Sequence, residues 1–257
     1  MDASRPLIPM HLADLADPPP DRPAPVFDVF LAASSLDAST VTRFQERADR
    51  FSPSRPTIHA LAEPAAPVRL GRPRARTDRV LADRRSEREF GDRVLSQKDL
   101  ERLLGALSSS DDAPGRRTWA SAGGLAAVQV HVVCRNVDGR FGGAVHRYRF
   151  EEHALARVAD VPSDDRLHRL FSITGDLPAA FVVLGLLVEE SLVKYGERGG
   201  RFALMEVGAA AQTLSLRLAD VGLRGYLLGG VLDDEVTVAV GATGTAYRPM
   251  LALAVAR

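Results

Sequence analysis

The sequence KYGERGGRFALMEVGAAAQTLSLRLADVGLRGYLLGG, residues 194–230, holds a polar motif, a long apolar segment and a short run that ends in two glycines. Residues 201–221 are apolar on nearly every side, so we expect a buried core helix there. Gly208 and residues 209–211 lack large side chains, and an interior glycine is costly in a helix, so we expect a second backbone to pack against them. Gly222 predicts a left-handed cap. A strand over 225–228 then ends at Gly229-Gly230, where bare amides can approach a ligand.

The composition is that of an ordinary globular protein: 257 residues, 46% hydrophobic and 26% charged. The 33 basic and 33 acidic residues balance, so nothing argues for nucleic acid or an acidic membrane surface as a partner. The longest apolar run, residues 177–188, is too short to span a bilayer, and no signal-peptide pattern opens the chain, so we expect a cytoplasmic protein. The single cysteine, Cys134, offers neither a disulfide nor a metal pair, and we expect it to be buried and inert.

The chain divides by its prolines. Twelve of the sixteen fall between Pro6 and Pro73, bracketing one helical stretch near 39–50. Proline removes amide donors and disfavours helix at the residue before it, so we expect residues 1–75 to form an arm, partly extended or disordered, and 76–257 to form the main domain. A recognition role for the arm is the alternative to a structural one.

The main domain alternates helical and strand patterns without a regular strand–helix–strand repeat, which predicts the α+β class. The residues around Ser96-Asp99 predict a helix cap, and Asp138-Gly139 predicts the turn of a hairpin. We expect helices from 77, over 97–107, 163–171 and 189–195, and from 233, and strands over 126–134, 143–150, 178–188 and 249–256.

Three guanidinium groups and a hydroxyl crowd the segment RRSEREF, residues 84–90, beside a helix end. The planar donor fork of arginine matches phosphate oxygens in pairs, so Arg84, Arg85, Ser86 and Arg88 make a candidate anion site. The alternative is a solvated charged face in which these arginines pair with neighbouring carboxylates.

A second candidate is the loop RRTWASAGG, residues 116–124. Its small residues let a flat ligand approach the backbone, and Ser121 could donate to a ligand oxygen. Alternatively, the glycines only permit a turn.

The third candidate is Lys194-Tyr195. The chain contains only two lysines, Lys98 and Lys194, among its 33 basic residues. Lysine can titrate when it is buried and arginine cannot, so a lysine beside a phenol is a candidate acid/base pair. The alternative is a helix-end lysine that neutralises carbonyl groups. The six histidines show no metal-ligand spacing, so no metal site is expected, and no hydrolase or nucleotide-binding motif is present.

Taken in order, RRSEREF, the SAGG loop, KYGERGGRFALMEVGAAAQ and the Leu228-Gly229-Gly230 turn resemble the flavin-dependent nitroreductase superfamily, and within it the SagB-type azoline dehydrogenases. The resemblance spans about 80–257. It implies an α+β sheet-and-helix sandwich, an intertwined homodimer, and FMN at the subunit interface.

The resemblance also implies roles for individual residues. The FMN phosphate and ribityl chain would be held by Arg84, Arg85, Ser86 and Arg88, with Arg257 adding a phosphate contact. Ser121 would lie near the flavin, and the amides of Leu228, Gly229 and Gly230 would face its ring edge. Lys194 and Tyr195 would be catalytic. The chain departs from the usual pattern at Gly200, where tyrosine is frequent, at Ala209 and Thr213 in the core helix, and in the loop, which loses an aromatic.

The implied activity is oxidation of thiazoline or oxazoline rings in a modified peptide to thiazoles or oxazoles, with a cyclodehydratase as a further partner. Two alternatives remain open: an NAD(P)H-dependent nitro- or quinone reductase on the same fold, and a flavin-poor scaffold subunit of a peptide-modifying complex.

Overall fold

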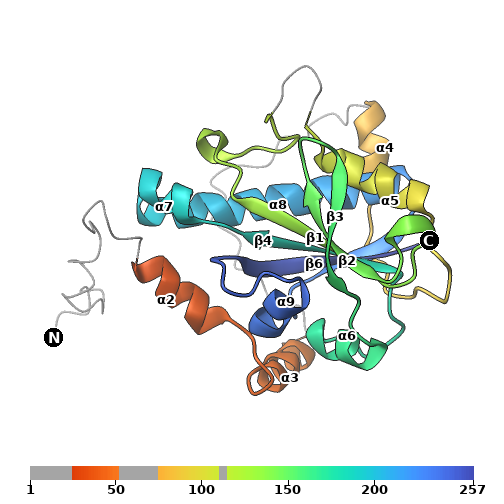
Figure 1. Cartoon of the computed structure of the whole chain (residues 1–257), viewed down its shortest axis with the longest axis horizontal. Coiled ribbons are helices and arrows are strands. Elements are labelled where there is room, and N and C mark those ends of the chain that lie inside the picture. The colour runs from red at the N-terminus through yellow and green to blue at the C-terminus, as the bar shows by residue number, and fades with distance from the viewer. Residues whose placement is uncertain (1–24, 52–74, 110–114) are drawn as a thin grey trace, which may run out of the picture.

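The computed structural model describes residues 25–51, 75–109 and 115–257 (Figure 1). Its helices are α2 (Pro25–Ser34), α3 (Val41–Phe51), α4 (Arg76–Asp83), α5 (Gln97–Leu104), α6 (Asp164–Leu170), α7 (Glu189–Tyr195), α8 (Glu197–Asp220) and α9 (Asp233–Ala239), with short 3₁₀ turns η1 (Gly105–Leu107), η2 (Ala122–Gly124) and η3 (Gly139–Phe141). The strands are β1 (Val128–Cys134), β2 (Ala144–Arg149), β3 (Ala154–Asp160), β4 (Ala180–Leu186), β5 (Arg224–Leu228) and β6 (Arg248–Ala256).

The strands form one antiparallel sheet in the order β3-β2-β1-β4-β6-β5, with β4 buried along its whole length. Alternate residues of β1 and β4 point to opposite faces, so the sheet builds two cores. Helices α2, α5 and α8 cover one face, and α6 and α9 cover the other (Figure 1). This arrangement confirms the expected α+β sheet-and-helix sandwich.

Helix α8 lies along the sheet and buries ten residues, among them Ala203, Ala210 and Leu214. The expectation that it is buried on every side is wrong, because one stripe faces outward: Met205 is 66% exposed. Gly208 lies on the same stripe, and a β-carbon built there would meet nothing within 4 Å. No second backbone in the described part of the chain therefore approaches Gly208, whereas Ala210 and Ala211 of the same patch are buried in the core.

Most predicted elements of the main domain are present. Ser96 Oγ accepts the Asp99 amide at 3.0 Å and begins α5, and Gly222 has the expected positive φ of 70°. Cys134 is fully buried, and burial raises the pKa of its thiol to about 12. Strand β3 was not predicted, because its alternation is weak and most of its residues are at least partly exposed.

The N-terminal arm contains more helix than its prolines indicate. Helix α3 is present where a helical stretch is expected, but α2 lies in a segment for which an extended course is expected. The prolines before and after these two helices fall at 1–24 and 52–74, outside the described residues. No helix in the described ranges is both long and apolar enough to cross a membrane.

Candidate active site

Lys194 and Tyr195 occupy the last turn of α7, where the chain breaks at Gly196 before α8 begins. Gly196 has φ +55° and ψ −146°, a conformation that favours glycine. Tyr195 packs edge-on against Phe202, with ring centroids 5.2 Å apart. The break therefore fixes the phenol at the start of the long helix.

The polar tips of this pair meet over the SAGG loop. Gly123 has φ +61°, and a β-carbon built on it would stand 2.6 Å from Lys194 Nζ and also collide with Tyr195 Oη. The ammonium nitrogen lies 5.3 Å from the centroid of the Tyr195 ring. Two candidates far apart in sequence, the Lys-Tyr motif and the small-residue loop, are thus one site.

A buried glutamate holds the loop in place. Glu206, only 3% exposed on α8, accepts Trp119 Nε1 at 3.2 Å and Ser121 Oγ at 2.9 Å. Ser121 Oγ in turn accepts the Ala126 amide at 2.9 Å. The Ser121 hydroxyl is therefore engaged within the loop, and its role toward a cofactor stays a prediction. A signal that could have identified Glu206 is its place as a lone acid in an apolar segment.

The loop also borders a cavity of about 430 Å³. Its walls are the loop residues themselves: Gly115, Arg116, Arg117, Thr118, Trp119, Ala120, Ser121 and Gly124. The Arg117 guanidinium forms an ion pair with Glu151 at 2.9 Å and lies over the Phe150 ring. The cavity therefore lies along the loop, and neither Lys194 nor Tyr195 lines it.

The arginine segment lies elsewhere, against the outer edge of β5. The Glu87 amide donates to the Gly225 carbonyl at 3.0 Å, and the Glu87 carboxylate pairs with Arg224 at 3.4 Å. Arg88 lies 5.0 Å over the ring of Tyr226, and Phe90 stacks on the same ring. Backbone pairing and ring stacking hold this segment along the edge of the sheet.

The predicted alternative for this cluster holds only in part: Arg85, Ser86 and Arg88 are exposed, as on a solvated face, but the expected pairing with neighbouring carboxylates is not what the described residues show. Asp83 pairs with Arg79, and Glu87 pairs with Arg224. Among the described residues, no carboxylate lies within 4.0 Å of a guanidinium nitrogen of Arg84, Arg85 or Arg88. Three unneutralised guanidinium groups on one short segment suit a multiply charged anion.

The remaining predicted residues lie along the same edge. Leu228 is buried and pairs with Ala252, Gly229 is exposed, and Gly230 lies near Ser172 and Phe44. Arg257 follows Ala256, which pairs with Arg224, and its guanidinium makes only a long contact of 3.9 Å to Asp99. Strand β5 therefore runs from the arginine segment to the glycine pair.

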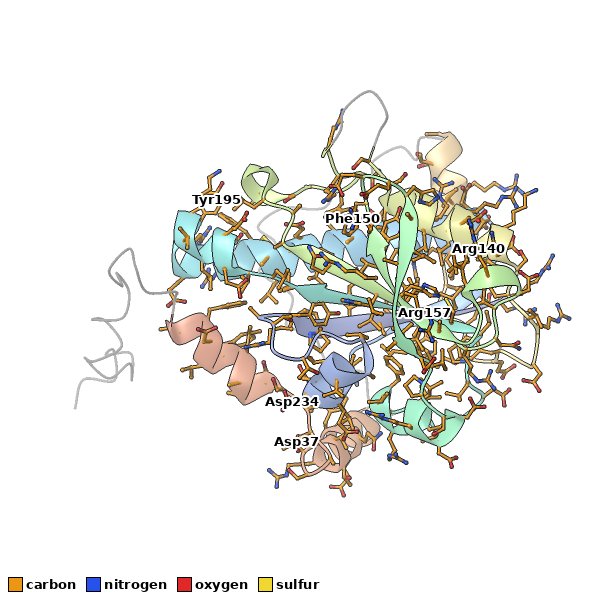
Figure 2. The ribbon with its side chains drawn as sticks, viewed as in Figure 1. Asp37, Arg140, Phe150, Arg157, Tyr195 and Asp234 are labelled. Atoms are coloured by element: carbon orange, nitrogen blue, oxygen red, sulfur yellow. The ribbon has the colours of Figure 1, made fainter. Side chains whose placement is uncertain are left out.

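The arginine segment and the Lys-Tyr pair stand at opposite ends of the sheet. Leu186, which ends β4 just before α7, pairs with Arg248 at the start of β6, whereas Gly225 pairs with Val255 near its end. Arg248 and Val255 are seven residues apart along β6, roughly 23 Å at about 3.3 Å per residue. Figure 2 shows Tyr195 far from the edge at which the chain ends in Figure 1.

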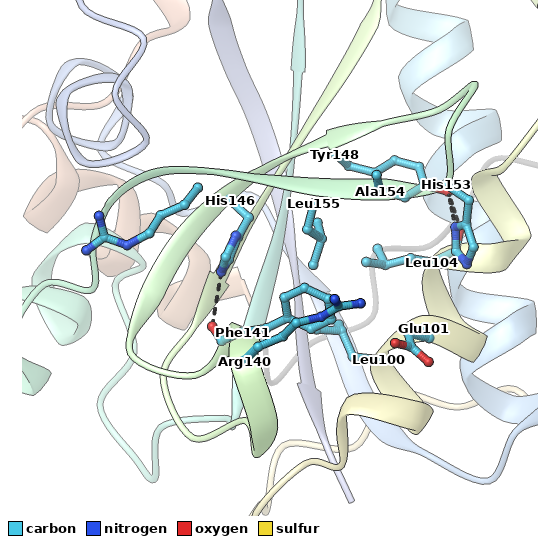
Figure 3. Close-up of a pocket in the computed structure, with 11 residues that line it drawn as sticks. Leu100, Glu101, Leu104, Arg140, Phe141, His146, Tyr148, His153, Ala154 and Leu155 are labelled. Carbon is cyan, nitrogen blue, oxygen red and sulfur yellow. Dashed lines mark hydrogen bonds between the residues drawn. The ribbon is translucent and has the colours of Figure 1, made fainter.

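A separate cavity of about 490 Å³ lies between α5 and the β2–β3 hairpin (Figure 3). His146 Nε2 lies 3.1 Å from the Phe141 carbonyl, and Tyr148 Oη lies 2.7 Å from His153 Nδ1. None of the predicted site residues lines this cavity. We therefore do not place the active site there.

Guanidinium groups without a carboxylate partner thus lie at one end of the edge strand β5, and the exposed Gly229 lies at the other. A family model, the Nitroreductase family, matches residues 81–257, more than half of the chain. The chain belongs to the nitroreductase family. This finding confirms the resemblance drawn from the four sequence motifs.

Two curated relatives are similar in sequence. The protein MJ1384 of Methanocaldococcus jannaschii, whose name assigns it to the nitroreductases, is 31% identical over 159 residues, 61% of this chain and 80% of that protein. The Microcin B17-processing protein McbC of Escherichia coli is 31% identical over 167 residues, 61% of this chain and 60% of McbC. The similarity to McbC agrees with the expected SagB-type branch.

Solved structures of the nitroreductase family share the fold. A chain of the E. coli microcin synthetase McbBCD complex, with truncated pro-MccB17 bound, superposes with a TM-score of 0.63 at 22% identity, covering 89% of this chain and 96% of that chain. A Ralstonia eutropha JMP134 structure described as a nitroreductase gives 0.58 at 22% identity, covering 80% and 98%.

Proposed function

We propose that this nitroreductase-family protein is an FMN-dependent dehydrogenase that oxidises thiazoline or oxazoline rings in a peptide to the aromatic azoles. The observation that carries the proposal is the convergence of Lys194 Nζ and Tyr195 Oη over Gly123 of the SAGG loop. The similarity to McbC, a protein named for processing microcin B17, supports a modified peptide as the substrate class.

We assign the FMN phosphate to Arg84, Arg85, Ser86 and Arg88, with Arg257 nearby, and the ring edge to the amides of Leu228, Gly229 and Gly230. The free guanidinium groups and the exposed Gly229 support this assignment. Because the Lys-Tyr pair stands at the far end of β6, we propose that each site combines two chains of a homodimer. One chain would supply the arginine segment and β5, and the other the Lys-Tyr pair and Ser121.

The chemistry divides between cofactor and protein. When bound, FMN supplies the two-electron acceptor that takes a hydride from the ring β-carbon, and dioxygen serves as the final oxidant. Tyr195 Oη or Lys194 Nζ takes the proton from the ring α-carbon, and the neighbouring group stabilises the charge that develops. Gly123 leaves room for both tips. The substrate loses two hydrogen atoms in each turnover.

The test begins with the purified protein, which we expect to be yellow with about one FMN per chain. A thiazoline peptide should lose about two mass units in air without NADPH. Stopped-flow mixing with NADPH in the absence of air should bleach the flavin slowly or not at all. Rapid bleaching without azole formation would favour a nitro- or quinone reductase, and colourless protein that takes up no FMN would favour a scaffold subunit.

The same test addresses the partner. We propose that the protein acts with a cyclodehydratase that forms the azoline rings, since a chain of the McbBCD complex shares its fold. Azoline peptide made by chemical synthesis should be oxidised without that partner. Oxidation that requires the partner would place the complete site in a heteromeric complex.

A further inference from the structure

Helix α2 of the arm is docked at its first turn by the residue that begins α8. The Glu197 carboxylate accepts the Val26 amide and the Phe27 amide, one through each oxygen, both at 3.0 Å. The first amides of a helix have no partner within the helix, and a carboxylate there is also favoured by the helix dipole. The arm is therefore anchored two residues after Tyr195.

A second contact, between Phe27 and Gly200 of α8, holds the same turn of α2. A β-carbon built on Gly200 would stand 2.5 Å from Phe27 Cγ, and Phe27 is only 6% exposed. Any side chain at position 200 would displace the ring. Glycine on α8 and phenylalanine on α2 thus form a matched pair.

The segment just after the end of α2 is held on α9. The Leu36 amide donates to Asp233 Oδ2 at 2.8 Å, and the Asp233 amide donates back to the Leu36 carbonyl at 3.0 Å. Asp233 is half-buried, so this reciprocal pair is shielded from water. Residues 26–36 thus bridge from the start of α8 to the start of α9 (Figure 1).

The bridge covers a cavity of about 250 Å³. The arm contributes nearly half of its walls, and the rest comes from α8, the strand end after β5, the start of α9 and the start of β6. The lining residues are Phe30, Leu31, Ser34, Ser35, Leu36, Phe44, Leu204, Gly229, Val231, Asp233, Arg248, Pro249 and Met250. Most of this lining is apolar. The cavity reaches Gly229, which belongs to the strand end that we assign to the edge of the flavin ring.

We propose that α2 and the start of α3 form the substrate-side wall of the active site, and that Phe30 selects an azoline whose neighbouring residue in the peptide is apolar. The proposal rests on the proposed function. The volume suits one side chain beside the ring rather than a long segment. The lining holds one charge of each sign, Asp233 and Arg248, so the discriminating neighbour is an uncharged one. Asparagine, which is close to leucine in shape, would replace apolar contacts with Phe30 and Leu31 by desolvated polar atoms.

The experiment compares two synthetic thiazoline peptides that differ only in the residue after the ring, leucine or asparagine. FMN-loaded wild-type protein should prefer the leucine peptide by about tenfold in kcat/KM, the range that one hydrophobic contact supplies. Phe30→Ala should lose most of this preference through KM, with kcat and flavin content unchanged. Val29→Ala is the matched control, because Val29 lies on the same helix, is 67% exposed and does not line the cavity.

Hydrogen exchange gives a readout that does not depend on turnover. The amides of residues 26–36 should exchange more slowly when the leucine peptide is added, and Glu197→Ala should speed their exchange in its absence. The proposed role of α2 would be overturned if wild-type protein oxidised both peptides equally, or if Phe30→Ala kept the wild-type ratio of kcat/KM between the two peptides. The proposed function would stand in either case. Wild-type protein that shows no protection by either peptide and no azole formation would overturn both.

Discussion

The ammonium nitrogen of Lys194 lies 2.6 Å from the point that a β-carbon would occupy on Gly123. The two residues are 71 positions apart in sequence, and only a residue without a side chain lets the loop pass beneath the Lys-Tyr pair. The loop is held from the other side by the buried Glu206. The loop therefore lies between the Lys-Tyr pair on one side and Glu206 of α8 on the other.

We predict that Lys194→Ala and Tyr195→Phe each retain FMN and lose azole formation. A general acid or base contributes about 100- to 10,000-fold to the rate. The measurement is flavin content beside single-turnover oxidation of a thiazoline peptide. Val193→Ala is the control, since Val193 lies on the same helix and is 73% exposed. Wild-type rates in both variants would assign proton removal to another group or to water.

We predict that Arg88→Ala weakens FMN binding by about 10- to 100-fold, because a hydrogen bond between charged groups contributes about 1.5–3 kcal/mol. Flavin fluorescence during titration of the apoprotein measures the affinity. Arg79→Ala, which removes an exposed arginine already paired with Asp83, should leave affinity unchanged. Equal affinities in the two variants would refute the phosphate assignment.

The sequence predicted the parts of the site better than their arrangement. The arginine segment, the SAGG loop and the Lys-Tyr pair each carry residue types that suit a local chemistry. Periodicity within one element does not report which ends of a sheet two elements share, so the separation along β6 required the register. Within the sequence, two features indicate a second chain: the resemblance to a dimeric family and the small-residue patch at 208–211.

The contact of Gly200 with Phe27 also could not be predicted from the sequence. The family that the chain resembles frequently has tyrosine at this position. Glycine in its place indicates, from the sequence alone, only that an aromatic side chain is lost. In the structure Phe27 fills the space, from an arm whose prolines argued against helix. A contact between residues 173 positions apart leaves no periodic trace, whereas the local hairpin and the capped helix α5 do.

We predict a homodimer that uses the exposed stripe of α8. Met205→Glu should shift the protein toward monomer, because the interface would bury an unpaired charge. Light scattering after size-exclusion chromatography measures the mass. Val238→Glu, on α9 and 54% exposed, is the control. Wild-type monomer that still holds FMN tightly would count against the shared site.

We predict that stability falls as the pH drops from 6.5 toward 4 because of His131. Burial, with the nearby Arg147 guanidinium, lowers the pKa of this histidine from 6.5 to about 4. The unfolded chain therefore takes up the proton first, and the contribution, complete above pH 6.5, is lost across that interval. It amounts to about 3 kcal/mol, at about 1.4 kcal/mol per pKa unit.

Thermal unfolding of His131→Phe checks this pH dependence. The variant should show a flatter fall in Tm between pH 6.5 and 4 than the wild type. His153→Gln, which removes an exposed histidine, should keep the wild-type slope. Parallel curves for the wild type and His131→Phe would show that other groups control the acid limb.

We predict, finally, that Gly123→Ala inactivates the protein and Gly124→Ala does not. Both glycines have positive φ, 61° and 70°, so either alanine costs about 1–2 kcal/mol in backbone strain. Only the β-carbon at 123 meets Lys194 and Tyr195; the one at 124 meets nothing within 4 Å. Gly123→Ala should therefore lower azole formation as far as Lys194→Ala does, with flavin content and Tm matching those of Gly124→Ala. Equal activity in the two glycine variants would mean that the pair adjusts freely above the loop, and that its position over Gly123 is not what catalysis requires.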